Sequence, residues 1–309
     1  MTLRRSLTVL VGVAALSLAV VACGSSDAAG SGAPADGTVP VVASTNVYGA
    51  VVRAVGGEHV SVTSIIDSPD ADPHEYESRP ADAAAVTKAK LLVMNGGGYD
   101  DFATKLVASA GSSPAIIDAV QLSGLEQAAG SGGFNEHVWY HLPTVRKVAD
   151  QIAKDLGTVD PANAAAYTAN ATTFDGQVAG LTSKLEAIKA QHAGKRVAVT
   201  EPVPLYEIEA AGLVDATPEE FSTAVEEGND PPAAVLDETM KLVTGGDVKA
   251  LVSNSQTESP TTTRVEDAAK AAGVPIVSVT ETLPAGVDDY VAWQSSQIHA
   301  LTAALNGTA

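Results

Sequence analysis

The sequence predicts an α/β protein with two open α/β lobes joined by one long, rigid helix. In both halves of the chain, short runs rich in Val, Ile and Leu alternate with segments of helical periodicity. This alternation is typical of parallel sheets whose strands are connected by helices. A third segment, 161–191, has helical periodicity without an internal proline after its first residue. Such a helix would be roughly 45 Å long, which is more than one lobe needs, so we expect it to join the two lobes.

The first residues have the pattern of a secretory signal peptide. Arg4 and Arg5 precede an uncharged apolar run that ends at Ala22, and the run is short for a membrane span, which needs about 20 residues. Cys23 is the only cysteine, so an intramolecular disulfide is excluded. Its position after small residues resembles the bacterial lipobox, in which the thiol is lipidated and becomes the mature N-terminus. The alternatives are an ordinary signal peptide or a short membrane anchor.

The composition of the chain indicates how it is divided and which partners it does not bind. Residues 24–37 are rich in Gly, Ser and Ala and predict a flexible tether. The net charge of −19 argues against a nucleic-acid partner, because phosphate binding needs a basic surface. The predicted division of the chain is a signal peptide (1–22), a lipidated tether (23–38), an N-terminal α/β lobe (39–157), a connecting helix (158–193) and a C-terminal α/β lobe (194–309).

The N-terminal lobe shows four β-branched runs separated by helical segments. Strands are expected at 39–45, 60–66, 90–95 and 115–120. Helices are expected near 47–55, 81–89, 99–109 and 143–156.

The connecting helix follows Asp160-Pro161, where Asp160 can cap the helix and Pro161 suits its first turn. One face of this helix carries Tyr167, Phe174, Val178, Leu181, Leu185 and Ile188. In the C-terminal lobe, strands are expected at 196–200, 248–254 and 274–280, with a last helix near 291–305.

Four imidazole or carboxylate side chains lie at the ends of predicted strands or in loops. His74 comes after the strand 60–66, and His137 precedes a helix. Glu201 and Glu281 directly follow two strands of the second lobe. Open parallel sheets bind ligands beyond the carboxyl ends of their strands, so these four residues, two from each lobe, form a candidate cage for a divalent cation. Taken singly, a His in a loop or a Glu at a strand end is usually an ordinary solvent-exposed side chain, and only the set of four together indicates a site.

Several motifs together resemble one family, the metal-binding cluster A-I solute-binding proteins of bacterial ABC transporters. The resemblance covers essentially the whole mature chain. Its motifs are Ser44-Thr45-Asn46, Asp72-Pro73-His74-Glu75-Tyr76-Glu77, Glu136-His137-Val138-Trp139-Tyr140, Asn254-Ser255-Gln256 and Val279-Thr280-Glu281-Thr282. The family fold implies two α/β lobes bridged by a rigid helix, with the metal site in the interlobe cleft.

The same resemblance implies the site residues. His74 and His137 match the first two ligands of the family. Glu201 falls where zinc receptors usually have His and manganese receptors usually have Glu. Glu281 falls at or beside the position of the final Asp, which is a departure from the family pattern and leaves open whether a neighbour serves instead.

Three further residues are candidates to lie beside these ligands, namely His141, Asn46 and Asn254.

The implied function is an extracytoplasmic, high-affinity receptor that delivers a divalent metal to an ABC permease with its cytoplasmic ATPase. Two His and two Glu can supply six donor atoms, which favours Mn²⁺ slightly over Zn²⁺. Zinc binds most sites more tightly than manganese does, and this opposes the preference for Mn²⁺. Fe²⁺ is a further alternative. We expect a monomer held at the outer face of the cell membrane by the lipid on Cys23.

Two other functions compete with this one. A metal-dependent hydrolase would use a Glu near the metal to activate water. The chain has no nucleophile elbow and no His-Glu-x-x-His, and only Glu75 or His141 offers a spare base; the sequence therefore does not favour an enzyme. An adhesin or a structural lipoprotein is the second alternative.

Overall fold

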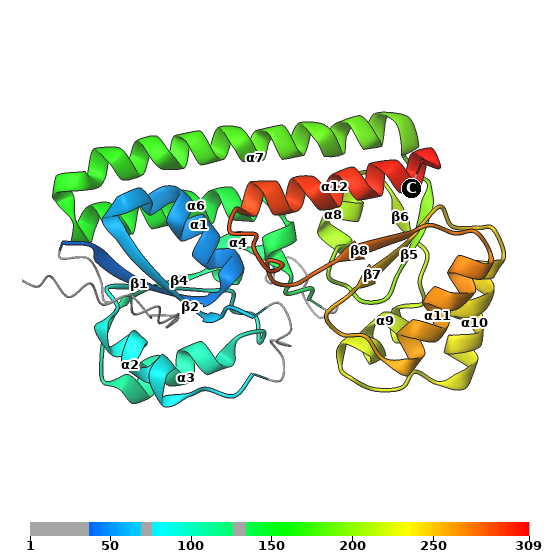
Figure 1. Cartoon of the computed structure of the whole chain (residues 1–309), viewed down its shortest axis with the longest axis horizontal. Helices are drawn as coiled ribbons and strands as arrows, with labels where there is room; N and C mark the ends of the chain where they lie inside the picture. The colour runs from blue at the N-terminus through cyan, green and yellow to red at the C-terminus, as the bar shows by residue number, and fades with distance from the viewer. Residues whose placement is uncertain (1–36, 69–75, 126–133, 309) are drawn as a thin grey trace, which may run out of the picture. The chain divides into compact units, whose positions relative to one another are not determined.

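The computed structural model describes residues 37–68, 76–125 and 134–308 (Figure 1). The predicted signal peptide, Cys23, most of the predicted tether and His74 lie outside these residues. The lipidation and the first of the four predicted ligands therefore stay predictions from the sequence.

Four parallel strands form the sheet of the N-terminal lobe, in the order β2-β1-β3-β4. They are β1 (Val39–Thr45), β2 (Val60–Ile66), β3 (Leu91–Met94) and β4 (Ala115–Asp118). All four lie on predicted strand segments. β4 ends two residues earlier than predicted because the carboxylate of Asp118 accepts the backbone N–H of Gln121 at 2.8 Å and so caps the short helix α4 (Ala119–Ser123).

Helices cover both faces of this sheet. Successive residues of β1 point to opposite sides: Val41 packs with α1 (Asn46–Gly56) and α6 (Leu142–Val159), whereas Val42 packs with α2 (Pro80–Lys88) and α3 (Asp101–Ala110). A parallel sheet buried on both faces needs such continuous apolar strands.

The C-terminal lobe repeats this architecture with the strand order β6-β5-β7-β8. Its strands are β5 (Arg196–Val199), β6 (Val214–Asp215), β7 (Leu251–Asn254) and β8 (Ile276–Val279). Its helices are α8 (Leu205–Ala210), α9 (Glu219–Glu226), α10 (Ala233–Thr244), α11 (Pro260–Ala271) and α12 (Tyr290–Asn306). Three strands match the prediction. β6 was not predicted, because two residues at a sheet edge are too few to show a period.

The long helix α7 (Ala164–His192) connects the two lobes. It packs against α1 and α6 of the first lobe and against α8 and α12 of the second (Figure 1). All six apolar residues of its predicted face are buried. The prediction of a helix from 161 is wrong for the first turn, because Pro161–Asn163 is a 3-10 turn. Asp160 does not cap it; its carboxylate instead accepts the hydroxyl of Tyr167 at 2.7 Å.

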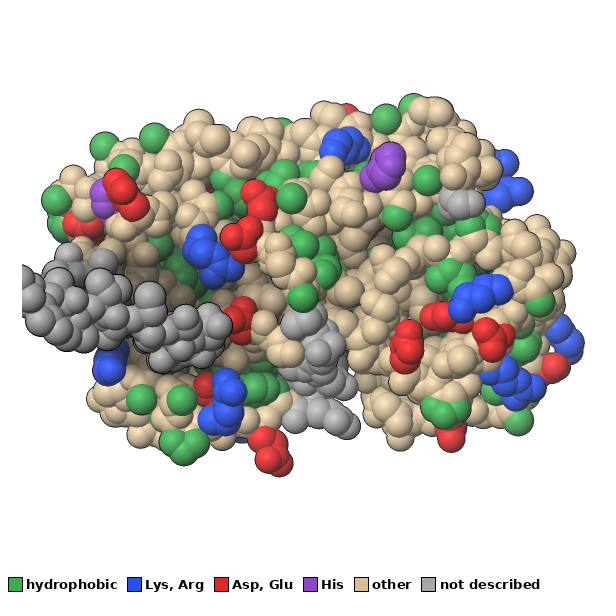
Figure 2. All heavy atoms as spheres, in the orientation of Figure 1, with side chains coloured by type: hydrophobic (Ala, Val, Ile, Leu, Met, Phe, Trp, Pro, Cys, Tyr) green, Lys and Arg blue, Asp and Glu red, His purple; other side chains and the backbone are tan. Residues whose placement is uncertain are grey.

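The surface of the described residues is mixed in charge. On the face in Figure 2, basic and acidic side chains lie among one another over α10 and α11. Among residues 37–68, 76–125 and 134–308, no helix combines the length and the apolar character that a membrane crossing requires.

Candidate metal centre

Two predicted ligands lie at the carboxyl edge of the second sheet. Glu201 follows β5 by two residues and Glu281 follows β8 by two residues. β7 lies between those strands, and its last residue, Asn254, therefore lies between the two carboxylates. The side-chain amide of Asn254 donates to Glu201 Oε2 at 2.7 Å and to Glu281 Oε1 at 2.9 Å. The order of the strands thus brings together two acids that are far apart in the sequence.

Both carboxylates are buried and held by hydrogen bonds. Glu201 is 2% exposed and Glu281 is 1% exposed. The hydroxyl of Thr257 donates to Glu201 Oε1. The hydroxyl of Tyr99, which precedes α3 in the other lobe, donates to Glu281 Oε2 at 3.0 Å. Each carboxylate oxygen accepts a hydrogen bond, so the orientations of both groups are fixed before any ligand arrives.

His137 is fully buried, and its ring orientation is set by Asn135. The backbone N–H of His137 donates to Asn135 Oδ1 at 3.1 Å, and ring Nδ1 lies 2.7 Å from the same oxygen. Because that atom already accepts the backbone N–H, it is the carbonyl oxygen, and Nδ1 is the ring donor. The neutral tautomer then has its lone pair on Nε2, which is the arrangement that metal-binding histidines adopt.

The side chain that approaches His137 Nε2 was not predicted from the sequence. It is Glu226, the last residue of α9, whose Oε1 lies 3.5 Å from Nε2. Burial raises the pKa of Glu226 to about 8, and the negative charges of Glu136, Glu201 and Glu281 add to the effect. The only signal in the sequence is helical spacing, which places Glu226 four residues after Ser222, on the buried face of α9.

The described residues do not by themselves complete a metal site. Within 37–68, 76–125 and 134–308, no three His, Cys, Asp or Glu side chains have the geometry to hold one ion. His74, the remaining predicted ligand, lies outside these ranges. The structure thus brings Glu201 and Glu281 together and places His137 beside Glu226, and it leaves the complete set of four as a prediction.

One family model matches most of the chain. The model of the ZnuA family, described as zinc-uptake complex component A, periplasmic, matches residues 41–304. This chain belongs to that family. The resemblance inferred from the motifs around His74, His137 and Glu281 is thereby confirmed.

Individual relatives are similar in sequence or in fold. The manganese-binding lipoprotein MntA of Halalkalibacterium halodurans is 32% identical over 163 residues, and the match spans 52% of each chain. The iron ABC transporter substrate-binding lipoprotein MtsA of Streptococcus pyogenes is 28% identical over 272 residues, which is 84% of each chain. The periplasmic zinc-binding protein TroA from Treponema pallidum matches with a TM-score of 0.72 at 18% identity, covering 87% of this chain and 99% of that one. That structure supports the two-lobed fold.

Three residues of this ZnuA-family chain were expected beside the ligands, and only one of them, Asn254, contacts the predicted carboxylate ligands. Asn254 contacts both carboxylates, as described above. Asn46 instead bonds the backbone of Leu283, accepting its N–H at 2.9 Å and donating to its carbonyl at 3.2 Å. His141 contacts Thr144 Oγ1 at 2.8 Å and packs on the ring of Tyr206, and burial lowers its pKa. Asn46 therefore ties the first lobe to the segment after Glu281 through two hydrogen bonds to the backbone of Leu283.

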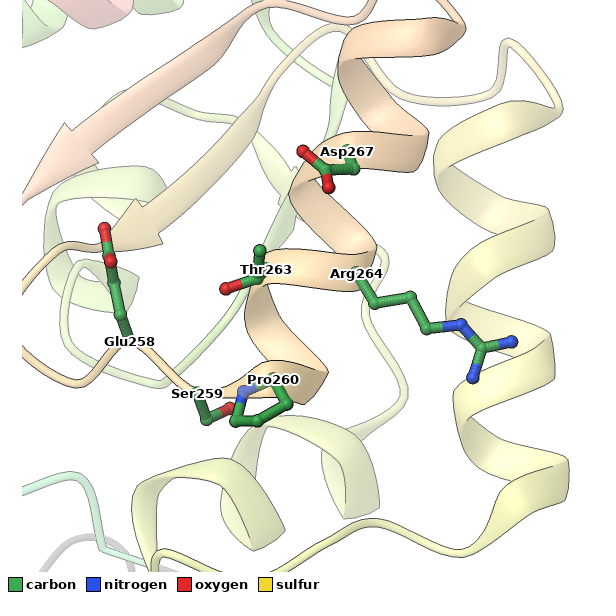
Figure 3. Close-up of a pocket in the computed structure, with 6 residues that line it drawn as sticks. All are labelled: Glu258, Ser259, Pro260, Thr263, Arg264 and Asp267. Atoms are coloured by element: carbon green, nitrogen blue, oxygen red, sulfur yellow. The ribbon is translucent and has the colours of Figure 1, made fainter.

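An acidic cavity opens beside the candidate site. Its volume is about 1070 Å³, and α9 and the segments 134–136 and 256–259 contribute to its wall. Seven carboxylates line it, and none of the described lining residues is Lys, Arg or His. They are Glu136, Asp215, Glu219, Glu226, Glu227, Asp230 and Glu258. In the adjoining pocket at the start of α11, Arg264 extends toward α10 and away from Glu258 (Figure 3).

Proposed function

We propose that this protein captures a divalent transition metal outside the cytoplasm and delivers it to an ABC permease for import. The observation that carries this function is the position of Tyr99. Its hydroxyl bonds Glu281 at 3.0 Å, and its ring centre lies 6.0 Å from that of His137. An imidazole of one lobe and a carboxylate of the other therefore lie around a single side chain. Membership of the ZnuA family supports a role in metal uptake.

The proposed ligands are His74, His137, Glu201 and Glu281. Neutral imidazole suits zinc, manganese and iron, whereas carboxylate oxygen shifts the preference toward harder ions such as Mn²⁺. Two carboxylates held ready at the edge of one sheet favour Mn²⁺ slightly over Zn²⁺. Relatives whose names specify manganese and iron agree with a site of this kind.

The proposed location is the outer face of the cell membrane, and the partners are a permease and its cytoplasmic ATPase. The lipoprotein names of the relatives support a lipid anchor. The anchor proposed here is the thiol of Cys23, and the mature receptor acts as a monomer.

Replacement of Cys23 by Ala is expected to abolish lipid labelling and to release the protein from the membrane or leave it as uncleaved precursor. The thiol is the only group at that position that can accept the lipid. Incorporation of a fatty-acid probe, followed by fractionation, measures this. Persistent labelling of Cys23→Ala would rule out this anchor, and a Ser25→Ala variant should label as the wild type does.

The two competing functions make different demands. A hydrolase needs an open metal position and turnover of a substrate, and the family is described as an uptake component. An adhesin needs no stoichiometric ion. Assays of generic ester hydrolysis and of metal stoichiometry therefore separate both from metal capture, which requires one tightly bound ion and no turnover.

The ion preference is tested by equilibrating the mature protein with equal Mn²⁺ and Zn²⁺ and analysing the bound metal. We expect one ion per chain, with Mn²⁺ in the majority. In Glu201→His, a carboxylate is replaced by a softer imidazole, so the ratio of bound Zn²⁺ to Mn²⁺ should rise about tenfold or more. An exposed control, Glu209→His, should keep the wild-type ratio. An unchanged ratio in Glu201→His would remove Glu201 from the ligand set.

A further inference from the structure

We propose that Gln256 is a positioning residue, which holds the loop that carries Glu281 in place for metal capture. Gln256 is the last residue of the motif Asn254-Ser255-Gln256, and it lies in the segment that follows β7. This inference rests on the proposed function, because it concerns how one of the proposed ligands is held.

The side chain of Gln256 binds the backbone of the loop 280–283, which follows β8. Its Oε1 accepts the backbone N–H of Glu281 at 2.6 Å and that of Thr282 at 2.9 Å. Its Nε2 donates to Thr282 Oγ1 at 2.7 Å. An amide oxygen has two lone pairs, and two N–H groups occupy them here. One side chain therefore fixes two successive peptide groups of the loop, at the ligand and directly after it.

The same segment also holds the carboxylate end of Glu281. The backbone N–H of Gln256 donates to Asn254 Oδ1 at 3.1 Å, and Nδ2 of that amide donates to Glu281 Oε1 at 2.9 Å. Several rotatable bonds separate the backbone of a glutamate from its carboxylate. With Gln256 at one end and Asn254 at the other, fewer rotamers are lost when an ion binds, and such preorganisation increases affinity.

Side chains of the first lobe hold the other residues of this loop. The hydroxyl of Tyr140 donates to the carbonyl oxygen of Thr280 at 2.7 Å. Asn46 bonds the backbone N–H and the carbonyl of Leu283. The loop is thus held residue by residue from both lobes, and Gln256 supplies the backbone contacts at the ligand itself.

Gln256→Met tests this role in the full mature protein, with Ser255→Ala as the matched control. Methionine is unbranched and similar in size but makes none of these hydrogen bonds. Gln256 is half-buried in the wall of the acidic cavity, so the fold should be retained, and thermal unfolding without metal checks this. Ser255 lies in the same segment, and its hydroxyl donates to the carbonyl of Val279 at 3.3 Å. By calorimetric titration with Mn²⁺, Gln256→Met should bind about tenfold more weakly, whereas Ser255→Ala should stay within about threefold of wild type.

A double-mutant cycle with Glu281→Gln separates positioning of the ligand from a general structural effect. Glu281→Gln alone should weaken Mn²⁺ binding, because a proposed ligand loses its charge. If Gln256 acts through Glu281, adding Gln256→Met to Glu281→Gln should have little further effect on the affinity, whereas a general structural effect would multiply the two losses. The visible spectrum of bound Co²⁺ reports the geometry of the ligands, so it should change in Gln256→Met and stay as in the wild type in Ser255→Ala.

Wild-type Mn²⁺ affinity or a wild-type Co²⁺ spectrum in Gln256→Met, or losses that multiply fully in the double variant, would overturn the role of Gln256. If Glu281→Gln weakens binding while Gln256→Met binds as the wild type does, the proposed function stands and this role does not. Unchanged binding in Glu281→Gln would instead remove Glu281 from the ligand set, and the role of Gln256 with it.

Discussion

His137→Ala is expected to weaken the binding of both Mn²⁺ and Zn²⁺ by about 100-fold or more, equivalent to roughly 2.7 kcal/mol. The imidazole is one of few donors, and its ring is already oriented by Asn135 and packed against Trp139 at 5.0 Å between ring centres. The other imidazole of this segment, His141, is turned toward Thr144. Calorimetric titration of the metal-free protein measures the loss.

Two controls make the result specific. His299→Ala removes an exposed imidazole from α12 and should bind metal as the wild type does. His137→Gln keeps most of the volume of the buried side chain, so that a loss of affinity shared with His137→Ala is due to the ligand and not to a cavity. Thermal unfolding without metal shows whether each variant is folded. Unchanged affinity in both His137 variants would remove this site from consideration.

The fold could be predicted because its signals are local. The β-branched runs that become β1 and β2 are bounded as predicted, and the apolar spacing from Tyr167 to Ile188 identifies α7. The errors occur where a few residues decide the structure. β6 has two residues, and Asp118 turns the end of a predicted strand into the start of α4. Such elements depend on tertiary pairing or on one cap, and periodicity does not report them.

The candidate site could be predicted only in part, for the same reason. Glu201 and Glu281 follow predicted strands, and the rule for open sheets places them at one edge. Asn254 bridges them because β7 lies between β5 and β8 in the sheet. This strand order could not be predicted from the sequence. Glu226 was missed because its contact with His137 joins residues 89 positions apart in different lobes. Helical spacing shows that Glu226 is near a buried face, but it does not show what that face meets.

A second buried carboxyl, outside the candidate site, contributes to the pH dependence of stability. Glu207 in α8 is 3% exposed, and its Oε2 receives no hydrogen bond from the described residues. Burial raises its pKa from 4.5 to about 8. Between these values the unfolded chain loses the proton while the folded protein keeps it, so folding is opposed more strongly as the pH rises. The contribution of Glu207 to stability therefore decreases by about 1.4 kcal/mol per pH unit and levels off above about pH 8.

Glu207→Gln should remove this dependence. The amide has nearly the same shape as the protonated carboxyl and cannot ionise, so the variant should gain stability relative to the wild type by about 3.5 kcal/mol between pH 5 and pH 8. Urea unfolding of the metal-free protein at several pH values measures the difference in unfolding free energy. Glu209→Gln, an exposed change in the same helix, should follow the wild type across this range. A constant difference between Glu207→Gln and wild type from pH 5 to pH 8 would show that Glu207 is ionised in the folded protein, because only a group protonated in the folded state and ionised in the unfolded state gives a slope of this sign.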